Sequence, residues 1–239
     1  MTRSREDTRR WVAEGTALMR RALPGRRGDA RALQSPSGLP GWTRAHLLSH
    51  VAANAAALGN LVTWARTGVV TPMYTSPEQR VADIAAGAAL PASELVDRFE
   101  RTAAELDDGW DRLTDDQWAA EVVTAQGRTV AASETPWMRA REAMVHAVDL
   151  DGGVGFADLP SDLCAALVTD IVEKRSTGGN PALIIVPTDA GERWWVHGDQ
   201  DPVPVHGPLA QLTAWLAGRP SHDLATTDGG PLPLLPSWL

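Results

Sequence analysis

The chain has 239 residues, which is long enough for one large or two modest domains with a buried core. Its 22 basic and 30 acidic residues give a formal net charge of -8, which argues against nucleic acid or an anionic membrane as the main partner. A single cysteine excludes an intramolecular disulfide framework, no apolar run approaches the ~20 residues that cross a bilayer, and the charged N-terminal segment lacks a signal peptide's apolar core, so we expect a cytoplasmic protein.

The first part of the chain shows the periodicity of helices. Apolar residues at steps of seven and four predict a helix over 7–23. A loop rich in glycine, proline and serine is predicted after it, at 25–41. A second, long helix is predicted to begin after Thr43, a candidate N-cap, and to end at Thr67, where Gly68 is a stop signal.

Two further helices are predicted before residue 152. The segment TPMYTSPEQR at 71–80 breaks the helical pattern with two prolines. A third helix is predicted over 91–113, with Ser93 as its candidate cap. A polar loop or short hairpin at 121–134 then leads to a fourth helix at 136–151. Four helices with such connections favour a four-helix bundle, a fold that often builds metal sites from facing helices.

The pattern changes after residue 152. Helices and β-branched strands alternate there, at 160–175 (helix), 181–187, 193–197 and 202–207 (strands) and 208–218 (helix). We therefore predict two domains, a four-helix metal-binding bundle over 1–155 and a smaller α+β domain over 156–239.

Three polar residues lie on the apolar faces of two predicted helices. At ~100° per residue, His50 falls on the flank of the inward stripe of the second helix, whereas His46 lies at its edge. Glu142 and His146 share a face with apolar neighbours on the fourth helix. An unpaired interior carboxylate costs several kcal/mol, so Glu142 needs a cationic partner, and a divalent metal ion would provide one.

His50, Glu142 and His146 would supply the ligands typical of a catalytic zinc, two imidazoles and one carboxylate with the fourth position open. However, a Glu and a His four residues apart on a helix usually form a surface pair, and a single inward histidine is usually a hydrogen-bonded core residue. The residues alone therefore leave metal binding and packing both open. We expect Asp149, one turn beyond His146, at the surface, with a contact behind a metal ligand as the alternative, and Cys164 as a buried, unreactive thiol.

Several stretches resemble the mycothiol-dependent maleylpyruvate isomerase family, whose first domain is a DinB-like four-helix bundle. They are GWTRAHLLSHVAANAAALGNLVTWARTG, TPMYTSPEQR, TAQGRTVAASETPWMRAREAMVHAVDL and the late AWLAGRP. The resemblance covers the whole bundle in order and extends more thinly into the C-terminal domain. It includes loop segments as well as apolar periodicity, which makes it specific.

The resemblance implies a zinc ion held by His50, Glu142 and His146, which match the family's ligand positions. It also implies an activity, the mycothiol-dependent conversion of maleylpyruvate, a small dicarboxylate, to fumarylpyruvate in the gentisate route of aromatic degradation. This cis-trans isomerisation proceeds by thiolate addition, bond rotation and elimination. An arginine near the end of the last helix is associated with the family's activity, and Arg219 matches it.

The implied chemistry needs cations for two carboxylates and a developing enolate. We predict Arg219 and Arg80 for this role, followed by Arg139 and Arg141, which flank Glu142 on its own helix. Any of these arginines would otherwise be a solvated surface residue.

Four residues are candidates for contacts to the thiol cofactor or substrate. Tyr74 lies in the family-like loop, and Asn54 lies one helical turn beyond His50; loop packing and a helix-to-helix hydrogen bond are the alternatives. Gln126 and Arg128 in the TAQGRT segment are candidate mycothiol contacts.

Two other functions remain open at this stage. A mycothiol S-transferase or thiol-exchange enzyme would keep the metal and the thiol but give a different product, since one fold serves several reactions. A helical binding module without catalysis would use the same histidines and glutamate only for packing. The metal content of the protein distinguishes the binding module, which would hold no zinc, from the two enzymes, which would hold about one zinc per chain.

Overall fold

The computed structural model describes residues 3–23, 29–177, 181–198, 200–236 and 238. Residues 25–28 of the predicted loop lie outside this described part. The chain divides into two compact units, Ser4–Val154 and Gly155–Leu239 with Arg3, and each is described by itself. Within the described residues, no helix combines the length and the hydrophobicity that a membrane span requires.

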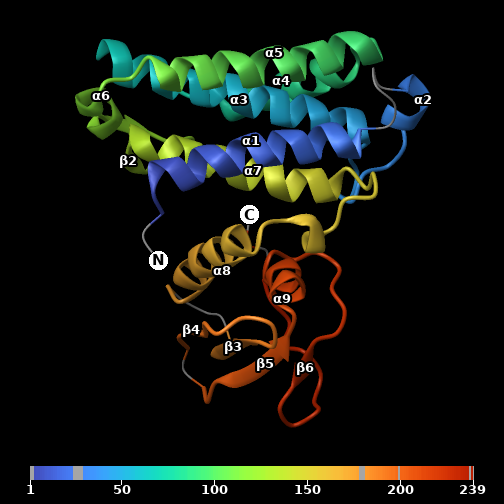
Figure 1. Cartoon of the computed structure of the whole chain (residues 1–239). Coiled ribbons are helices and arrows are strands. Elements are labelled where there is room, and N and C mark those ends of the chain that lie inside the picture. The colour runs from blue at the N-terminus through green and yellow to red at the C-terminus, as the bar shows by residue number, and fades with distance from the viewer. Residues whose placement is uncertain (1–2, 24–28, 178–180, 199, 237, 239) are drawn as a thin grey trace. The chain divides into compact units, whose positions relative to one another are not determined.

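Four long helices form the N-terminal unit (Figure 1). They are α1 (Arg5–Ala22), α3 (Arg44–Thr67), α5 (Ala92–Asp111) and α7 (Thr135–Asp149). α1 packs against α7, α7 against α3, and α3 against α5. The ring closes between α5 and α1, where Arg9 pairs with Asp107 at 2.7 Å and Arg20 with Glu100 at 2.6 Å. The predicted four-helix bundle is confirmed.

The central helix α3 carries the strongest local signals. The Thr43 hydroxyl caps its start by accepting the His46 N–H at 3.3 Å, and Gly68 ends it in the left-handed conformation with φ 72°. Both ends agree with the prediction. α3 packs against α4, α5 and α7 and is buried on most sides, because its many alanines let the neighbouring helices approach closely. His50 is therefore carried into the bundle interior.

Three shorter helices were not predicted: α2 (Ala30–Leu33), α4 (Pro77–Ala88) and α6 (Asp115–Ala119). Pro77, the second proline of the segment 71–80, begins α4 instead of excluding a helix. It occupies the first turn of α4, where no backbone N–H is needed. Ser76 caps α4 by accepting the Gln79 N–H at 3.1 Å. The predicted Ser93 cap is wrong, since α5 follows Pro91 directly and has no side-chain cap.

The core of the bundle is made of buried aliphatic and aromatic side chains, among them Leu47, Leu48 and Phe99. Gly15 lies inside α1, on the side that packs against α7. A Cβ atom at Gly15 would lie 2.9 Å from the Cβ of Ala143. The absence of a side chain therefore sets the spacing of these two helices, which explains a glycine in a helix interior.

The segment between α6 and α7, predicted as a loop or a hairpin, is a hairpin of β1 (Glu121–Val123) and β2 (Thr129–Ala131). The 3-10 turn η1 (Ala132–Glu134) follows it. The C-terminal unit is α+β, as predicted. Its elements are η2 (Phe156–Asp158), α8 (Ser161–Arg175), β3 (Leu183–Pro187), β4 (Trp194–Val196), β5 (Val203–Gly207), α9 (Leu209–Leu216) and the unpredicted β6 (Ala225–Thr226). The strand order is β4-β3-β5-β6, with β3 and β5 parallel and the outer pairs antiparallel.

Candidate metal centre

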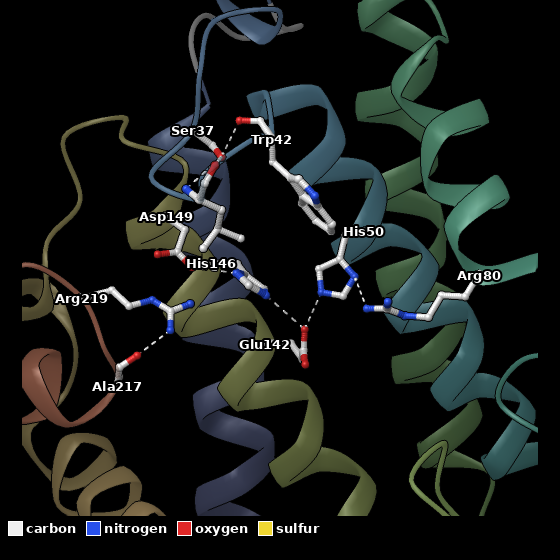
Figure 2. Close-up of polar contacts among 10 residues, drawn as sticks. Ser37, Trp42, His50, Arg80, Glu142, His146, Asp149, Ala217 and Arg219 are labelled. Atoms are coloured by element: carbon white, nitrogen blue, oxygen red, sulfur yellow. Dashed lines mark hydrogen bonds and ion pairs between the residues drawn. The ribbon is translucent and has the colours of Figure 1, made fainter. Parts of the chain in front are cut away.

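His50, Glu142 and His146 meet between α3 and α7 (Figure 2). His50 projects from the second turn of α3, and the other two lie one helical turn apart on α7, so that both side chains face α3. One donor atom from each of the three residues lies within 4.8 Å of the other two. His50 is buried, and Glu142 and His146 are half-buried.

A single carboxylate oxygen is the centre of this cluster. Oε2 of Glu142 lies 2.9 Å from Nε2 of His50 and 3.3 Å from Nε2 of His146. The two imidazole rings are nearly perpendicular, with an interplanar angle of 82° and centroids 5.0 Å apart. Both rings thus direct a nitrogen at the same oxygen.

Asp149 holds the far side of the His146 ring. Its Oδ2 accepts a hydrogen bond from Nδ1 of His146 at 2.9 Å. The expectation that Asp149 lies at the surface is wrong, because its exposed fraction is only 3%. The backbone oxygen of Asp149 accepts the N–H of Gly38 at 2.7 Å, so a loop from elsewhere in the sequence covers this end of α7.

Arg80 lies near the start of helix α4 and contacts the His50 ring on the side away from Glu142. Its Nη2 is 3.3 Å from Nδ1 of His50, and its guanidinium lies 5.6 Å from the centre of the Tyr74 ring. A guanidinium only donates hydrogen bonds, so Nδ1 of neutral His50 accepts and its Nε2–H donates to Glu142. Of the residues singled out as substrate contacts, Arg80 and Tyr74 are thus beside the cluster.

The protonation states follow from burial and from these contacts. Burial would raise the pKa of Glu142, but hydrogen bonds from His146 and His50 hold it well below its ordinary value. Burial would lower the pKa of His146, but the carboxylates of Asp149 and Glu142 raise it to about 9. For His50 burial prevails and the pKa is lowered. At neutral pH Glu142 is an anion, His146 a cation and His50 neutral.

The next layer of the bundle contains Asn54 and Arg139. Nη1 of the buried Arg139 donates to the backbone oxygen of Val51 at 2.7 Å and to Oδ1 of Asn54 at 3.0 Å. Burial lowers the pKa of Arg139 to about 10, which leaves it charged at neutral pH. Asn54 therefore makes a helix-to-helix hydrogen bond, one of the two roles that its position allowed.

Gln126, Arg128, Arg141 and Arg219 are the other candidate residues named from the sequence. Gln126 and Arg128 are exposed on the turn of the β1–β2 hairpin, where the Arg128 N–H donates to the Thr124 hydroxyl at 3.2 Å. The guanidinium of Arg141 lies 5.7 Å from the centre of the Trp137 ring. Arg219 belongs to the C-terminal unit, and its Nη1 donates to the backbone oxygen of Ala217 at 2.6 Å.

Sequence reasoning missed Trp42, whose ring packs edge-on against His50 with centroids 5.5 Å apart. Trp42 precedes the N-cap Thr43, a position where an apolar residue is usually explained by packing against the first turns of the helix. The signal in the sequence therefore pointed to helix capping and not to the candidate metal site.

The three residues fit a zinc ion. Zinc bonds of about 2.0–2.1 Å in a tetrahedron place ligand atoms about 3.3 Å apart. The two nitrogen–oxygen distances of 2.9 and 3.3 Å come within a few tenths of an ångström of that spacing. Two imidazoles and one carboxylate also leave one coordination position for an external ligand. A cation bound at both Nε2 atoms would satisfy the same carboxylate. His146 would give up its Nε2 proton, and His50 would carry its proton on Nδ1, in place of the contact from Arg80.

Fold and site together define a four-helix-bundle protein with a candidate His–Glu–His metal centre. Two family models match the chain, the mycothiol maleylpyruvate isomerase N-terminal domain over residues 25–151 and the MDMPI C-terminal domain over residues 158–237. The chain belongs to the mycothiol maleylpyruvate isomerase family. The resemblance seen in the sequence is thereby confirmed.

Two solved structures are similar over nearly the whole chain. A crystal structure of the mycothiol-dependent maleylpyruvate isomerase is 40% identical, with a TM-score of 0.90, over 98% of this chain and 99% of that one. A crystal structure of a histidine-to-alanine mutant of a mycothiol-dependent maleylpyruvate isomerase is 39% identical, with a TM-score of 0.89 and the same coverage. No curated protein matches the chain.

Proposed function

We propose that the chain is a zinc- and mycothiol-dependent isomerase that converts maleylpyruvate to fumarylpyruvate. The observation that carries the proposal is the meeting of His50, Glu142 and His146 on facing helices of a bundle that belongs to this family. The similar crystal structures, 39% and 40% identical, support the same activity. The substrate is a small dicarboxylate, and the proposal involves neither nucleic acid nor a membrane.

In this proposal His50, Glu142 and His146 hold the zinc. Bound zinc would lower the pKa of a thiol at the open position and so supply a thiolate at neutral pH. Asp149 accepts the Nδ1–H of His146, which orients the ring and keeps Nε2 directed at the site. Glu142 contributes the negative charge that a divalent cation needs in a buried position.

The thiol has to come from outside the chain. Cys164, the single cysteine, has an exposed fraction of 1%, and burial raises its pKa to about 11. A thiol of that kind is protonated at neutral pH and is a poor nucleophile. Mycothiol would supply a thiolate that adds to the cis double bond, permits rotation and then leaves.

Arg80 and Arg219 are the proposed partners of the substrate carboxylates and of the developing enolate. The proposal for Arg80 is supported by its guanidinium, which lies 3.3 Å from the outer nitrogen of His50 and over the Tyr74 ring. Tyr74, with its pKa raised chiefly by burial, stays protonated and can donate a hydrogen bond. We propose Tyr74, Gln126 and Arg128 as contacts to the cofactor, together with Asn54 through its amide nitrogen, since its Oδ1 accepts from Arg139. We propose the cytoplasm as the protein's location.

The test is a paired assay of zinc-loaded protein with maleylpyruvate, in the presence and absence of mycothiol. Formation of the trans isomer only with mycothiol, without net thiol consumption, supports the proposal. Stoichiometric consumption of thiol would favour the S-transferase. Turnover in neither reaction would favour a binding module.

A further inference from the structure

The loop of residues 36–43, which precedes α3, touches both helices that carry the candidate ligands. We propose that this loop positions the two histidine ligands, with Trp42 holding His50 and Gly38 holding the end of α7 behind His146. The inference rests on the metal site of the proposed function. Trp42 and Gly38 act through other residues, so they are positioning residues and not catalytic ones.

The first contact concerns the orientation of the His50 ring. Trp42 packs against one part of this ring with an interplanar angle of 72°, and the His146 ring packs against another at 82° (Figure 2). Edge-to-face pairs of this kind prefer a defined geometry. Because the torsion that turns an imidazole about its Cβ–Cγ bond is broad, neighbouring groups decide where its nitrogens point. Trp42 therefore restricts the direction in which Nε2 of His50 points.

The loop is itself held in one conformation. The backbone N–H and the hydroxyl of Ser37 both donate to the backbone oxygen of Trp42, each at 2.9 Å, and the Trp42 N–H donates to the oxygen of Leu39 at 3.1 Å. Pro36 and Thr43 form an antiparallel bridge at its base. Gly41 makes the turn with φ 79°, a conformation that glycine adopts without strain. The Trp42 ring is thus presented from a closed, hydrogen-bonded loop.

The second contact concerns α7. The Gly38 N–H donates to the backbone oxygen of Asp149 at 2.7 Å, and Asp149 in turn accepts from His146. A Cβ atom at Gly38 would lie 3.3 Å from that oxygen and 3.4 Å from the Cα of Asp149. A Cβ at these distances would be tighter than most side-chain contacts, so an alanine here would require the loop or the helix end to shift by a few tenths of an ångström. The same loop therefore contacts His50 on α3, and on α7 it contacts Asp149, which holds His146.

The test is the zinc dissociation constant, measured by competition with a chromophoric chelator, for the wild type and four variants. Trp42→Leu removes the ring that holds His50, and Trp42→Phe restores an aromatic ring. Gly38→Ala pushes the loop away from α7. Trp64→Leu is the matched control, because Trp64 is also half-buried but lies in the last turn of α3, 14 residues or about 21 Å beyond His50.

We expect Trp42→Leu to weaken zinc binding about 10- to 100-fold, the range seen when groups that orient metal ligands are removed. Gly38→Ala should weaken it more than threefold, whereas Trp42→Phe and Trp64→Leu should stay within threefold. The loss of zinc affinity should not follow the loss of stability. We therefore expect the ranking by zinc affinity to differ from the ranking by thermal unfolding temperature, measured without zinc, for Trp42→Phe, Gly38→Ala and Trp64→Leu.

A loss of less than threefold for Trp42→Leu, or an equal loss for Trp64→Leu, would overturn the inference. If Trp42→Leu does not fold, Gly38→Ala decides, and unchanged zinc affinity in that variant is the contrary result. A wild type that takes up no zinc would refute the metal site of the proposed function itself. Zinc binding that the loop variants leave unchanged would refute only the role of the loop.

Discussion

The hydrogen bond between Asp149 and His146 allows a quantitative prediction. Asp149→Asn keeps the shape of the side chain, and its amide oxygen can still accept the Nδ1–H of His146, but the negative charge is lost. Asp149→Ala removes the acceptor as well. Hydrogen bonds to charged groups contribute about 1.5–3 kcal/mol, and groups behind metal ligands change affinity about 10- to 100-fold, or about 1.4–2.7 kcal/mol. Since Asp149 is 3% exposed, solvent screening reduces these values little.

We therefore expect the zinc dissociation constant to rise about 10-fold in Asp149→Asn and about 100-fold in Asp149→Ala. Chelator competition at constant pH measures both. Asp151→Asn is the matched control, because Asp151 lies two residues further on with its side chain 78% exposed. Arg44 bonds its backbone oxygen at 2.6 Å, which the substitution keeps, and its carboxylate at 3.5 Å. The reasoning is refuted if Asp149→Asn and Asp149→Ala bind zinc within twofold of the wild type, or if Asp151→Asn loses as much.

Three further outcomes are expected. Arg219→Ala should retain its zinc while kcat/KM falls roughly 100-fold, as for the loss of one group that stabilises developing negative charge, and full activity would remove this arginine from the mechanism. Gly15→Val should lower the free energy of unfolding by about 1–3 kcal/mol, since a Cβ at Gly15 lies 2.9 Å from that of Ala143; an unchanged urea midpoint would contradict the close helix contact. Folding raises the pKa of the Cys164 thiol from 9.0 to about 11, so the thiol ionises at a lower pH in the unfolded chain than in the folded one. The free energy of unfolding should therefore fall between pH 9 and 11, by at most about 1.4 kcal/mol per pH unit. Cys164→Ala should not show this part of the pH dependence.

The inward faces of the candidate ligands could be predicted from the sequence because a helix repeats every 3.6 residues, whereas their role as zinc ligands was implied by the family resemblance. This period alone places Glu142 and His146 on one face, and the apolar neighbours of His50 mark the inward side of α3. The strong capping signals of Thr43 and Gly68 likewise set the length of α3. Such features depend on residues a few positions apart.

The features that were missed depend on contacts between distant segments. Asp149 is buried because Gly38, more than a hundred residues earlier, packs on its backbone. Trp42 reaches His50 only through the closed turn of its loop, and α4 was missed because Pro77 begins the helix instead of breaking it. Periodicity contains none of this information, since it describes each helix without its neighbours.

The zinc content of purified protein tests the central claim most directly. Elemental analysis should find about one zinc per chain in the wild type and in His46→Ala, whose histidine lies one turn earlier on α3 and bonds to Thr43 at 2.8 Å. His50→Ala should retain less than about a tenth of that amount. A wild type without zinc, or His50→Ala with as much zinc as His46→Ala, would contradict the assignment of His50, Glu142 and His146 as the metal ligands.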